Sequence, residues 1–160
     1  MRWWSGHRQK LSQQPTEFER FSLTLPPWPK EIAAIRRASF PSWFTASYSP
    51  MARYGSWMVA ATRGGRYIGY AQTVGFAGDR QICVLEEVAV LPDHRHLGLG
   101  KNLIVDTARW MNEVGYVTMQ ACPLHDGDQL IRAQWFQSLG FTRIGSSWHA
   151  PTEALALLAE

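Results

Sequence analysis

The stretch VLPDHRHLGLGK combines residue types that bind anions. It follows an apolar run that predicts a strand, and Pro92 ends strand pairing because proline has no N–H to donate. A helix is expected only after Gly98 and Gly100, so backbone N–H groups lie unpaired where the strand gives way to the helix. The helix dipole and the cations Arg95 and Lys101 favour negative charge there, and the glycines let a bulky group approach the main chain. We therefore expect this turn to bind a phosphate-bearing cofactor.

Two nucleotide-binding motifs do not fit this stretch. The nucleotide P-loop requires Gly at position 95 and Ser or Thr at position 102, where this sequence has Arg95 and Asn102. When Gly98 and Gly100 are aligned with the first two glycines of the dinucleotide-binding fingerprint, Leu103 stands where the third glycine belongs. Both motifs are therefore excluded.

The histidines and cysteines indicate no metal site. His94 and His96 stand close together, but no third ligand occurs at a convincing spacing, so we interpret them as surface histidines. Cys83 and Cys122 stand far apart in no metal-ligand pattern, and we interpret them as reduced core or strand residues in a reducing compartment. No metal cofactor is predicted.

The composition is that of a compact folded protein. Of 160 residues, 46% are hydrophobic, 12% aromatic and 18% charged, which argues against disorder and predicts a single domain over residues 1–160. No apolar run approaches the length of a membrane-spanning helix, and the beginning, MRWWSGHRQK, lacks the apolar stretch of a secretory signal. We therefore expect a cytoplasmic protein with no membrane partner.

The net charge of +3 is concentrated near the beginning of the chain. Residues 1–45 hold seven Lys and Arg against three Asp and Glu, whereas the rest is close to neutral. An acidic partner for this basic segment is one interpretation. We favour a solvated N-terminal arm over residues 1–17, and we do not expect nucleic-acid binding.

The pattern of apolar residues places the turn inside an α/β fold. An extended segment, FERFSLTL, precedes a helix that follows Pro29, KEIAAIRRA. Three strands come next, separated by the turns RGG and GDR: WMVAAT, RYIGYAQTVGFA and QICVLEEVAV. A helix ended by Gly115 is predicted after the glycines, from apolar residues at helical spacing: Leu99, Leu103, Ile104, Ala108 and Met111.

The C-terminal part continues the alternation of strands and helices. A strand, YVTMQAC, precedes a helix that runs from Asp128 to Leu139 and is closed by Gly140. A late strand, FTRIGSSW, leads to a short amphipathic tail over residues 152–159. The predicted order is β-α-β-β-β-α-β-α-β. Residues 39–56 carry aromatic side chains without a regular period, which predicts a loop or broken helix able to cover a pocket.

Two landmarks in this order point to a known family. The segment from Arg95 to Gly100 fits the pattern Arg/Gln-x-x-Gly-x-Gly/Ala, and AQWFQSLGF, residues 133–141, fits a helix that ends in two aromatic residues, three further residues and Gly-Phe. With these landmarks the chain resembles the GCN5-related N-acetyltransferase (GNAT) family over residues 18–148. The resemblance implies a mixed, mostly antiparallel α/β sheet, flanked by helices and splayed at the cofactor site.

The resemblance also implies acetyl-CoA as co-substrate. The pantetheine arm would pair with main-chain groups on the preceding strand, those of Val88, Ala89 and Val90. The pyrophosphate would lie on the amides of the turn, those of His96, Leu97, Gly98, Leu99, Gly100 and Lys101, with the cation of Arg95 beside them. Phe136, in the second landmark, is expected near the thioester.

Acetyl transfer to an amine needs a base, because an ammonium group has no lone pair to attack a thioester. Glu86 and Glu87 are the candidates, and alternation of side chains along a strand lets at most one of them face the acceptor cleft. Many members of the family carry an acidic residue at the position of Glu86, which is therefore our choice of base. The alternative is a carboxylate on a solvated face of the sheet.

Three residues depart from the family pattern and concern catalysis rather than binding. Phe136 stands where the family often has the tyrosine that protonates the leaving thiolate, and phenylalanine has no proton to give. Gln129 stands where many members have an asparagine, and Gln120 stands where some members have an acidic residue. His125 and Cys122 are nearby in sequence and could replace the missing acid, although a solvated loop histidine and a buried thiol are the simpler interpretations.

Two functions remain open from the sequence. The first is an acetyl-CoA-dependent N-acetyltransferase, an acyltransferase in which a primary amine attacks directly in a ternary complex. The second is a non-catalytic CoA-binding or regulatory module on the same fold. The acceptor is a small amine or antibiotic, an aminoacyl group, or a protein, and the sequence does not distinguish among them. The sequence also leaves open whether the protein forms a homodimer.

Overall fold

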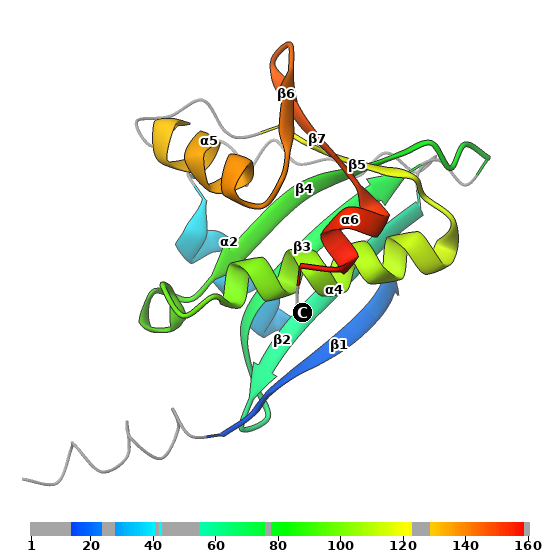
Figure 1. Ribbon diagram of the computed structural model, residues 1–160. Coiled ribbons are helices and arrows are strands. Elements are labelled where there is room, and N and C mark those ends of the chain that lie inside the picture. The colour runs from blue at the N-terminus through cyan, green and yellow to red at the C-terminus, as the bar shows by residue number, and fades with distance from the viewer. Residues whose placement is uncertain are drawn as a thin grey trace, which may run out of the picture.

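A seven-stranded sheet organises the residues that the computed structural model describes, which are 14–23, 28–40, 42, 55–75, 78–122 and 129–158. The strands lie in the order β1-β2-β3-β4-β5-β7-β6 (Figure 1). Their bounds are β1 Thr16–Leu23, β2 Gly55–Arg63, β3 Arg66–Gly75, β4 Ile82–Val90, β5 Thr118–Ala121, β6 Thr142–Ile144 and β7 Ser147–Pro151. Only β4 and β5 pair in parallel, and the other pairs among these strands are antiparallel. The predicted mixed, mostly antiparallel sheet is confirmed.

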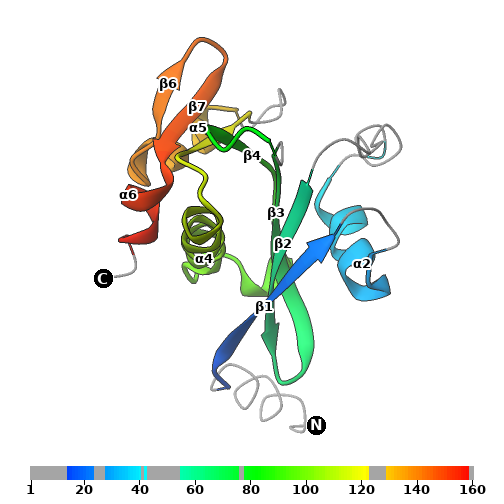
Figure 2. The same cartoon turned by 90° about the vertical axis from the view of Figure 1, so that its right-hand side faces the viewer.

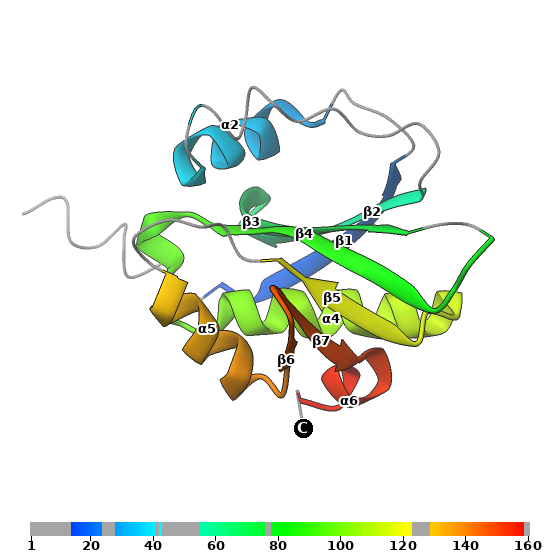
Figure 3. The same cartoon turned by 90° about the horizontal axis from the view of Figure 1, so that it is seen from above.

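The helices cover both faces of this sheet. Helix α2 (Lys30–Ser39) lies on one face, and α4 (Leu99–Val114) lies on the other (Figure 2). Seen from above, α5 (Gln129–Ser138) and α6 (Thr152–Ala156) lie on the same side as α4 (Figure 3). Side chains of β2 alternate between the two faces, so Met58 packs with α2 whereas Val59 belongs to the core under α4.

Helix α4 forms because its apolar residues recur on one stripe. All five residues that predicted this stripe are buried, and Leu103 at its centre has no exposed surface. The helix stops at Gly115, whose φ of +105° is the left-handed conformation that glycine adopts without strain. The N–H groups of Gly115 and Tyr116 both donate to the carbonyl of Met111, at 3.1 and 2.9 Å. Because α4 packs along the central strands, it fixes where its own first turn lies relative to β4.

The last predicted strand is wrong in one respect, because FTRIGSSW forms two strands rather than one. Strands β6 and β7 pair antiparallel, with Ile144 opposite Ser147. Gly145, in the turn between them, has a φ of +64°. A two-residue turn that starts with such a glycine matches the twist of a hairpin, and this local signal was overlooked in the sequence.

Several sequence predictions fall outside the described residues. Most of the aromatic segment 39–56, the expected helix start at Asp128 and the loop residue His125 are among them. In the part of the chain that is described, no helix is long and apolar enough to cross a membrane.

Candidate active site

The turn between β4 and α4, residues 91–98, carries unpaired main-chain donors. A short 3-10 helix, η1 (Pro92–His94), interrupts it, and α4 begins at Leu99 rather than after Gly100 as predicted. Gly98 occupies the N-cap with a φ of +77°. The N–H of Asn102 donates to the carbonyl of Gly98 at 3.0 Å, so the first helical residues before it have no carbonyl partner within the helix. This helix start is an anion-binding geometry.

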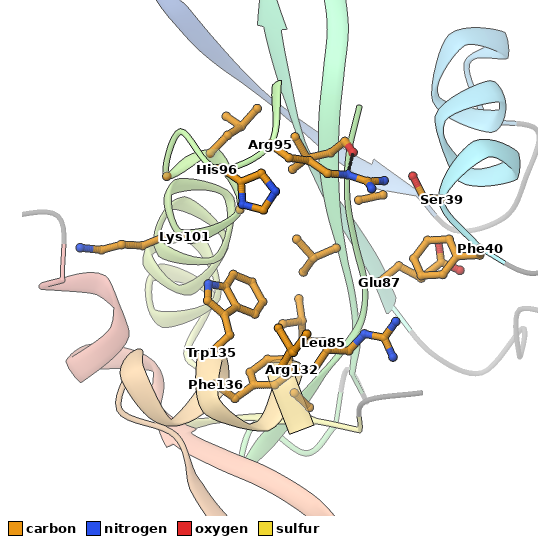
Figure 4. A pocket seen from close by; sticks show the side chains of 18 of the residues that line it. Ser39, Phe40, Leu85, Glu87, Arg95, His96, Lys101, Arg132, Trp135 and Phe136 are labelled. Carbon is orange, nitrogen blue, oxygen red and sulfur yellow. Dashed lines mark hydrogen bonds between the residues drawn. The ribbon is translucent and has the colours of Figure 1, made fainter. Parts of the chain in front are cut away.

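His96, in the same turn, adopts an unusual backbone conformation. Its φ of +63° is the only left-handed one among the non-glycine residues that the structure describes. Histidine tolerates this region better than most residues, but the conformation is still strained. The imidazole lies over the cavity beside the first turn of α4 (Figure 4).

The two predicted cations of the turn lie differently. The Nε of Arg95 donates to the carbonyl of Val90 at 2.8 Å, which holds the guanidinium across the end of β4 (Figure 4). Lys101 also lines the cavity, but its side chain points away from it (Figure 4). Of the two, only Arg95 therefore places its charge over the site.

Gly100 is small for a reason that the sequence did not show. A Cβ at this position would lie 3.2 Å from the indole of Trp135, which packs on the first turn of α4. The predicted second landmark thus brings an aromatic wall to the anion-binding turn. Trp135 was quoted in that landmark but not named as a site residue.

A cavity of about 730 Å³ joins this turn to the sheet. Its walls come from the end of α2, the second half of β4, the turn with the start of α4, the end of β5, and α5. The cavity exists because the parallel ladder between β4 and β5 ends at Leu85 and Ala121, whereas β4 continues to Val90. The two strands diverge beyond this point, in agreement with the predicted splay of the sheet. The second half of β4, with Val88, Ala89 and Val90, lines the gap.

A β-bulge in β4 lies at the centre of the cavity wall. Gln72 of β3 pairs with Glu87, but the next residue, Thr73, pairs with Leu85, so Glu86 is an extra residue in β4. A bulge of this kind bends the strand and redirects a side chain. It also reverses the alternation, since Leu85 belongs to the core under α4 and Glu87 faces α2.

The two glutamates around the bulge have opposite environments. Glu86 is exposed, whereas Glu87 is 2% exposed, and both residues line the cavity. The Glu87 carboxylate accepts from the Arg36 Nε at 2.8 and 3.1 Å and from the Tyr70 hydroxyl at 2.6 Å. Burial raises the pKa of Glu87, and these hydrogen bonds offset part of the shift by stabilising the charged form. The expectation that only one glutamate reaches the cleft assumed strict alternation, which the bulge breaks.

The opposite end of the cavity is mostly apolar. Phe136 lines it, is 7% exposed, and packs edge-on against Phe141 with ring centroids 5.1 Å apart. Cys122 also lines this end and is exposed, so its interpretation as a buried thiol is wrong. The Gln120 side chain donates to the Cys122 sulfur at 3.8 Å rather than lining the cavity.

The α2 wall of the cavity was not predicted from the sequence. Ser39 and Phe40, at the end of α2, line it, and the buried Arg36 of the same helix reaches Glu87 behind them. Arg132 of α5 extends into the cavity from the other side (Figure 4). A charged residue on the apolar stripe of a helix, as Arg36 is beside Ile32 and Ile35, was the available signal.

Among the described residues, no group of three His, Cys, Asp or Glu side chains could hold a metal ion. His94 lines the cavity, and its Nδ1 is buried with no hydrogen-bond partner in the described part of the chain. Burial and the positive charge of Arg63 lower the pKa of His94, while Asp93 acts in the opposite direction.

Solved structures show the same fold. The GNAT family acetyltransferase from Elizabethkingia anophelis with acetyl-CoA bound is 15% identical, with a TM-score of 0.56 over 79% of this chain and 77% of that chain. The Bacillus subtilis acetyltransferase in complex with CoA is 16% identical, with a TM-score of 0.58 over the same shares. The ribosomal-protein-S18-alanine N-acetyltransferase from Escherichia coli is 19% identical, with a TM-score of 0.59 over 85% of this chain and 94% of that chain.

At these identities the structures establish the fold and no shared substrate. No curated protein matches the sequence. Residues 53–143, more than half of the chain, match the acetyltransferase (GNAT) domain. This match spans the bulged strand, the anion-binding turn and the helix that carries Phe136, and so the chain belongs to the GNAT acetyltransferase family.

Proposed function

We propose that this protein is an acetyl-CoA-dependent N-acetyltransferase that moves an acetyl group to a primary amine by direct attack in a ternary complex. One observation carries the proposal: a single cavity joins the helix-start amides of α4 to the bulged acidic residue Glu86 of β4. A phosphate-binding geometry at one end and a carboxylate near the splay are the two features that this reaction requires.

The cofactor half of the cavity fits an extended thioester cofactor. The pyrophosphate accepts hydrogen bonds from amides of residues 96–101, of which all but the exposed Leu97 line the cavity, and Arg95 adds a positive charge. The pantetheine arm pairs with main-chain groups of β4 beyond its ladder with β5, those of Val88, Ala89 and Val90. The acetyl group then lies near the bulge, with Phe136 on its other side.

The chemistry needs one base and no dedicated acid. Glu86 accepts a proton from the ammonium, directly or through water, and the neutral nitrogen attacks the thioester carbonyl carbon. The C–N bond forms, the C–S bond breaks, and CoA leaves as a thiolate. The surplus proton on the new amide nitrogen reaches the thiolate through water, because Phe136 has no proton to give. Alignment of the two substrates supplies much of the acceleration.

Cofactor binding is tested by calorimetry and by melting with CoA and acetyl-CoA. We expect both ligands to raise the melting temperature of the wild type by mass action and Gly98→Val to abolish the shift. Gly145→Val is the matched control, because it places the same side chain at a left-handed glycine in the β6–β7 turn, which does not line the cavity. A folded wild type that shows no heat and no shift at saturating CoA would contradict the assignment.

A non-catalytic CoA-binding module is the second candidate, and Phe136 motivates it. A thiol-release assay with a broad panel of primary amines separates the two. The enzyme releases thiol as wild type and tolerates Phe136→Tyr with a modest change in turnover. The binding module holds acetyl-CoA, releases no thiol with any amine, and gains transfer only as Phe136→Tyr.

A further inference from the structure

A buried polar cluster of Arg36, Tyr70 and Glu87 backs the acceptor side of the cavity, which is the part lined by Ser39, Phe40 and Glu86; of the cluster, only Glu87 itself lines the cavity. Both oxygens of the Glu87 carboxylate are engaged, one of them by Arg36 and Tyr70 together. The guanidinium of Arg36 also lies over the ring of Trp28, 5.4 Å from its centroid, and Trp28 meets Tyr70 edge-on at 6.0 Å. The cluster therefore joins α2, the segment before it, and two central strands.

Stability alone is a weak explanation for such a cluster. Taking a carboxylate and a guanidinium out of water is unfavourable, and buried ion pairs are often replaced by apolar residues of similar volume without loss of stability. The surroundings here are apolar, since Ile32, Ile35 and Ala89 belong to the same core. An all-apolar contact would hold α2 on the sheet equally well.

The position of the cluster indicates another role. Glu87 is the residue directly after the bulged Glu86, so anchoring its carboxylate fixes one end of the bulge. Arg36 lies in the last turn of α2, just before Ser39 and Phe40, which line the cavity. One ion pair thus sets both the direction in which Glu86 leaves the strand and the distance from β4 to the end of α2. In Figure 4, Glu87 of β4 lies on the same side of the cavity as Ser39 and Phe40, opposite His96 and Trp135.

We propose that Arg36 and Glu87 are positioning residues for the amine acceptor: their ion pair holds the end of α2 against the bulge of β4, and so shapes the acceptor side of the site. This inference rests on the proposed transferase function. Neither residue touches the reacting atoms, and Tyr70 assists by orienting the carboxylate. The pair belongs to the wall opposite α4 and α5, and so lies away from the helix-start amides of α4 that bind the pyrophosphate.

The test is an apolar triple variant, Arg36→Met, Tyr70→Phe and Glu87→Leu, which removes every polar group of the cluster and keeps its volume. Calorimetry measures the Kd for CoA, and steady-state kinetics measure kcat and KM for the panel amine that gives the fastest thiol release with the wild type. We expect the Kd for CoA to stay within about twofold and kcat/KM for the amine to fall about tenfold or more, because small misplacements of reacting groups have large effects on rate.

Two further variants serve as a matched control and as a conservative substitution. Arg20→Met is the matched control, since Arg20 holds Asp106 and Glu113 of α4 from β1, away from the cavity, and its loss should leave all constants unchanged. Arg36→Lys keeps the charge without the planar guanidinium and should give an intermediate kcat/KM with the Kd for CoA unchanged, even if the triple variant does not fold.

The possible outcomes are distinct. Wild-type kcat/KM in the triple variant or in Arg36→Lys would overturn the inference and leave the transferase function intact. A loss in the affinity for CoA as large as the loss in kcat/KM for the amine would also overturn the inference, because the effect would then not be confined to the acceptor side. A wild type that releases no thiol with any amine overturns the proposed function itself, and this inference with it.

Discussion

The two halves of the cavity are built from different parts of the chain. The proposed cofactor half consists mainly of main-chain groups in one continuous segment, from the end of β4 to the first turn of α4. The proposed acceptor half is backed by side chains from three separate elements, namely Arg36 of α2, Tyr70 of β3 and Glu87 of β4. One half is set by local conformation and the other by packing of distant segments.

This difference predicts different sensitivities to mutation. A main-chain site tolerates side-chain changes as long as the backbone can adopt its conformation, so only positions such as Gly98 are critical. A site held by buried side chains is sensitive to each partner, because removing one leaves the others desolvated. The effects expected from this contrast differ in size, and the largest is expected in the acceptor half.

Removing Arg36 alone should be the most damaging change in the acceptor half. Arg36→Met leaves the Glu87 carboxylate buried without its counter-ion, which lowers the free energy of unfolding by about 3–5 kcal/mol. Urea denaturation measures this loss. Arg20→Met, which breaks a more exposed ion pair, should lower it by less than about 1 kcal/mol. Equal effects of the two variants would remove the contrast between buried and exposed pairs.

The two glutamates at the bulge should differ in kinetics. Glu86→Gln removes the proposed base and lowers kcat by about 100-fold, with the Kd for CoA unchanged. Its effect should be strongest below the pKa of the acceptor amine, where a proton must be removed. Glu87→Gln keeps a neutral acceptor for Arg36 and Tyr70 and should change kcat less. The reverse ranking in a thiol-release assay would transfer the role of base to Glu87.

In the cofactor half, His96→Gly should stabilise the protein. Glycine relieves the left-handed conformation of this residue, and the gain exceeds the added entropy of the unfolded chain by about 0.5 kcal/mol. The affinity for CoA should not change, because in the proposed site the amide of His96, and not its imidazole, binds the anion. His96→Ala, which removes the imidazole and keeps the strain, is the control. A shared loss of affinity in both variants would show that the imidazole contacts the ligand.

The smallest effect concerns His94 and pH. Its pKa is lowered in the folded state, so the unfolded chain binds more protons as the pH falls below about 6.5, and stability is lost through that range. His94→Asn cannot titrate, and its melting temperature should fall less than that of the wild type between pH 7 and pH 5, by about 2 °C or less. Parallel pH profiles of the two proteins would contradict the assigned direction.

Much of the fold and of the proposed cofactor half could be predicted because their signals are local. Strand-forming residues indicated β2, β3 and β4, the apolar stripe indicated α4, and Gly115 marked its end, whereas its start at Leu99 lies before the predicted one. One wrong prediction was local in origin, because the turn signal at Gly145 was overlooked. The other was not, because side-chain alternation was extended through β4, whose bulge depends on its pairing with β3.

The acceptor half could not be predicted in the same way. Arg36 and Glu87 are separated by 51 positions, and nothing in the residues between them shows that helix α2 crosses β4 at the bulge. The bulge itself follows from the register between β3 and β4, which the sequence of β4 does not specify.

The order of the elements, the turn between β4 and α4 and the family could be inferred from the amino-acid sequence, because each depends on residues that are neighbours along the chain. The packing of distant elements sets which glutamate is buried, which cation faces the cavity, and why a side chain at Gly100 would crowd Trp135. These outcomes depend on contacts with Arg36, Tyr70 and Trp135, whose positions are set when α2 and α5 pack around β4 and α4. The spacing of residues along the chain sets local backbone conformation, whereas the packing of helices on the sheet determines which side chains are buried and which side chains pair.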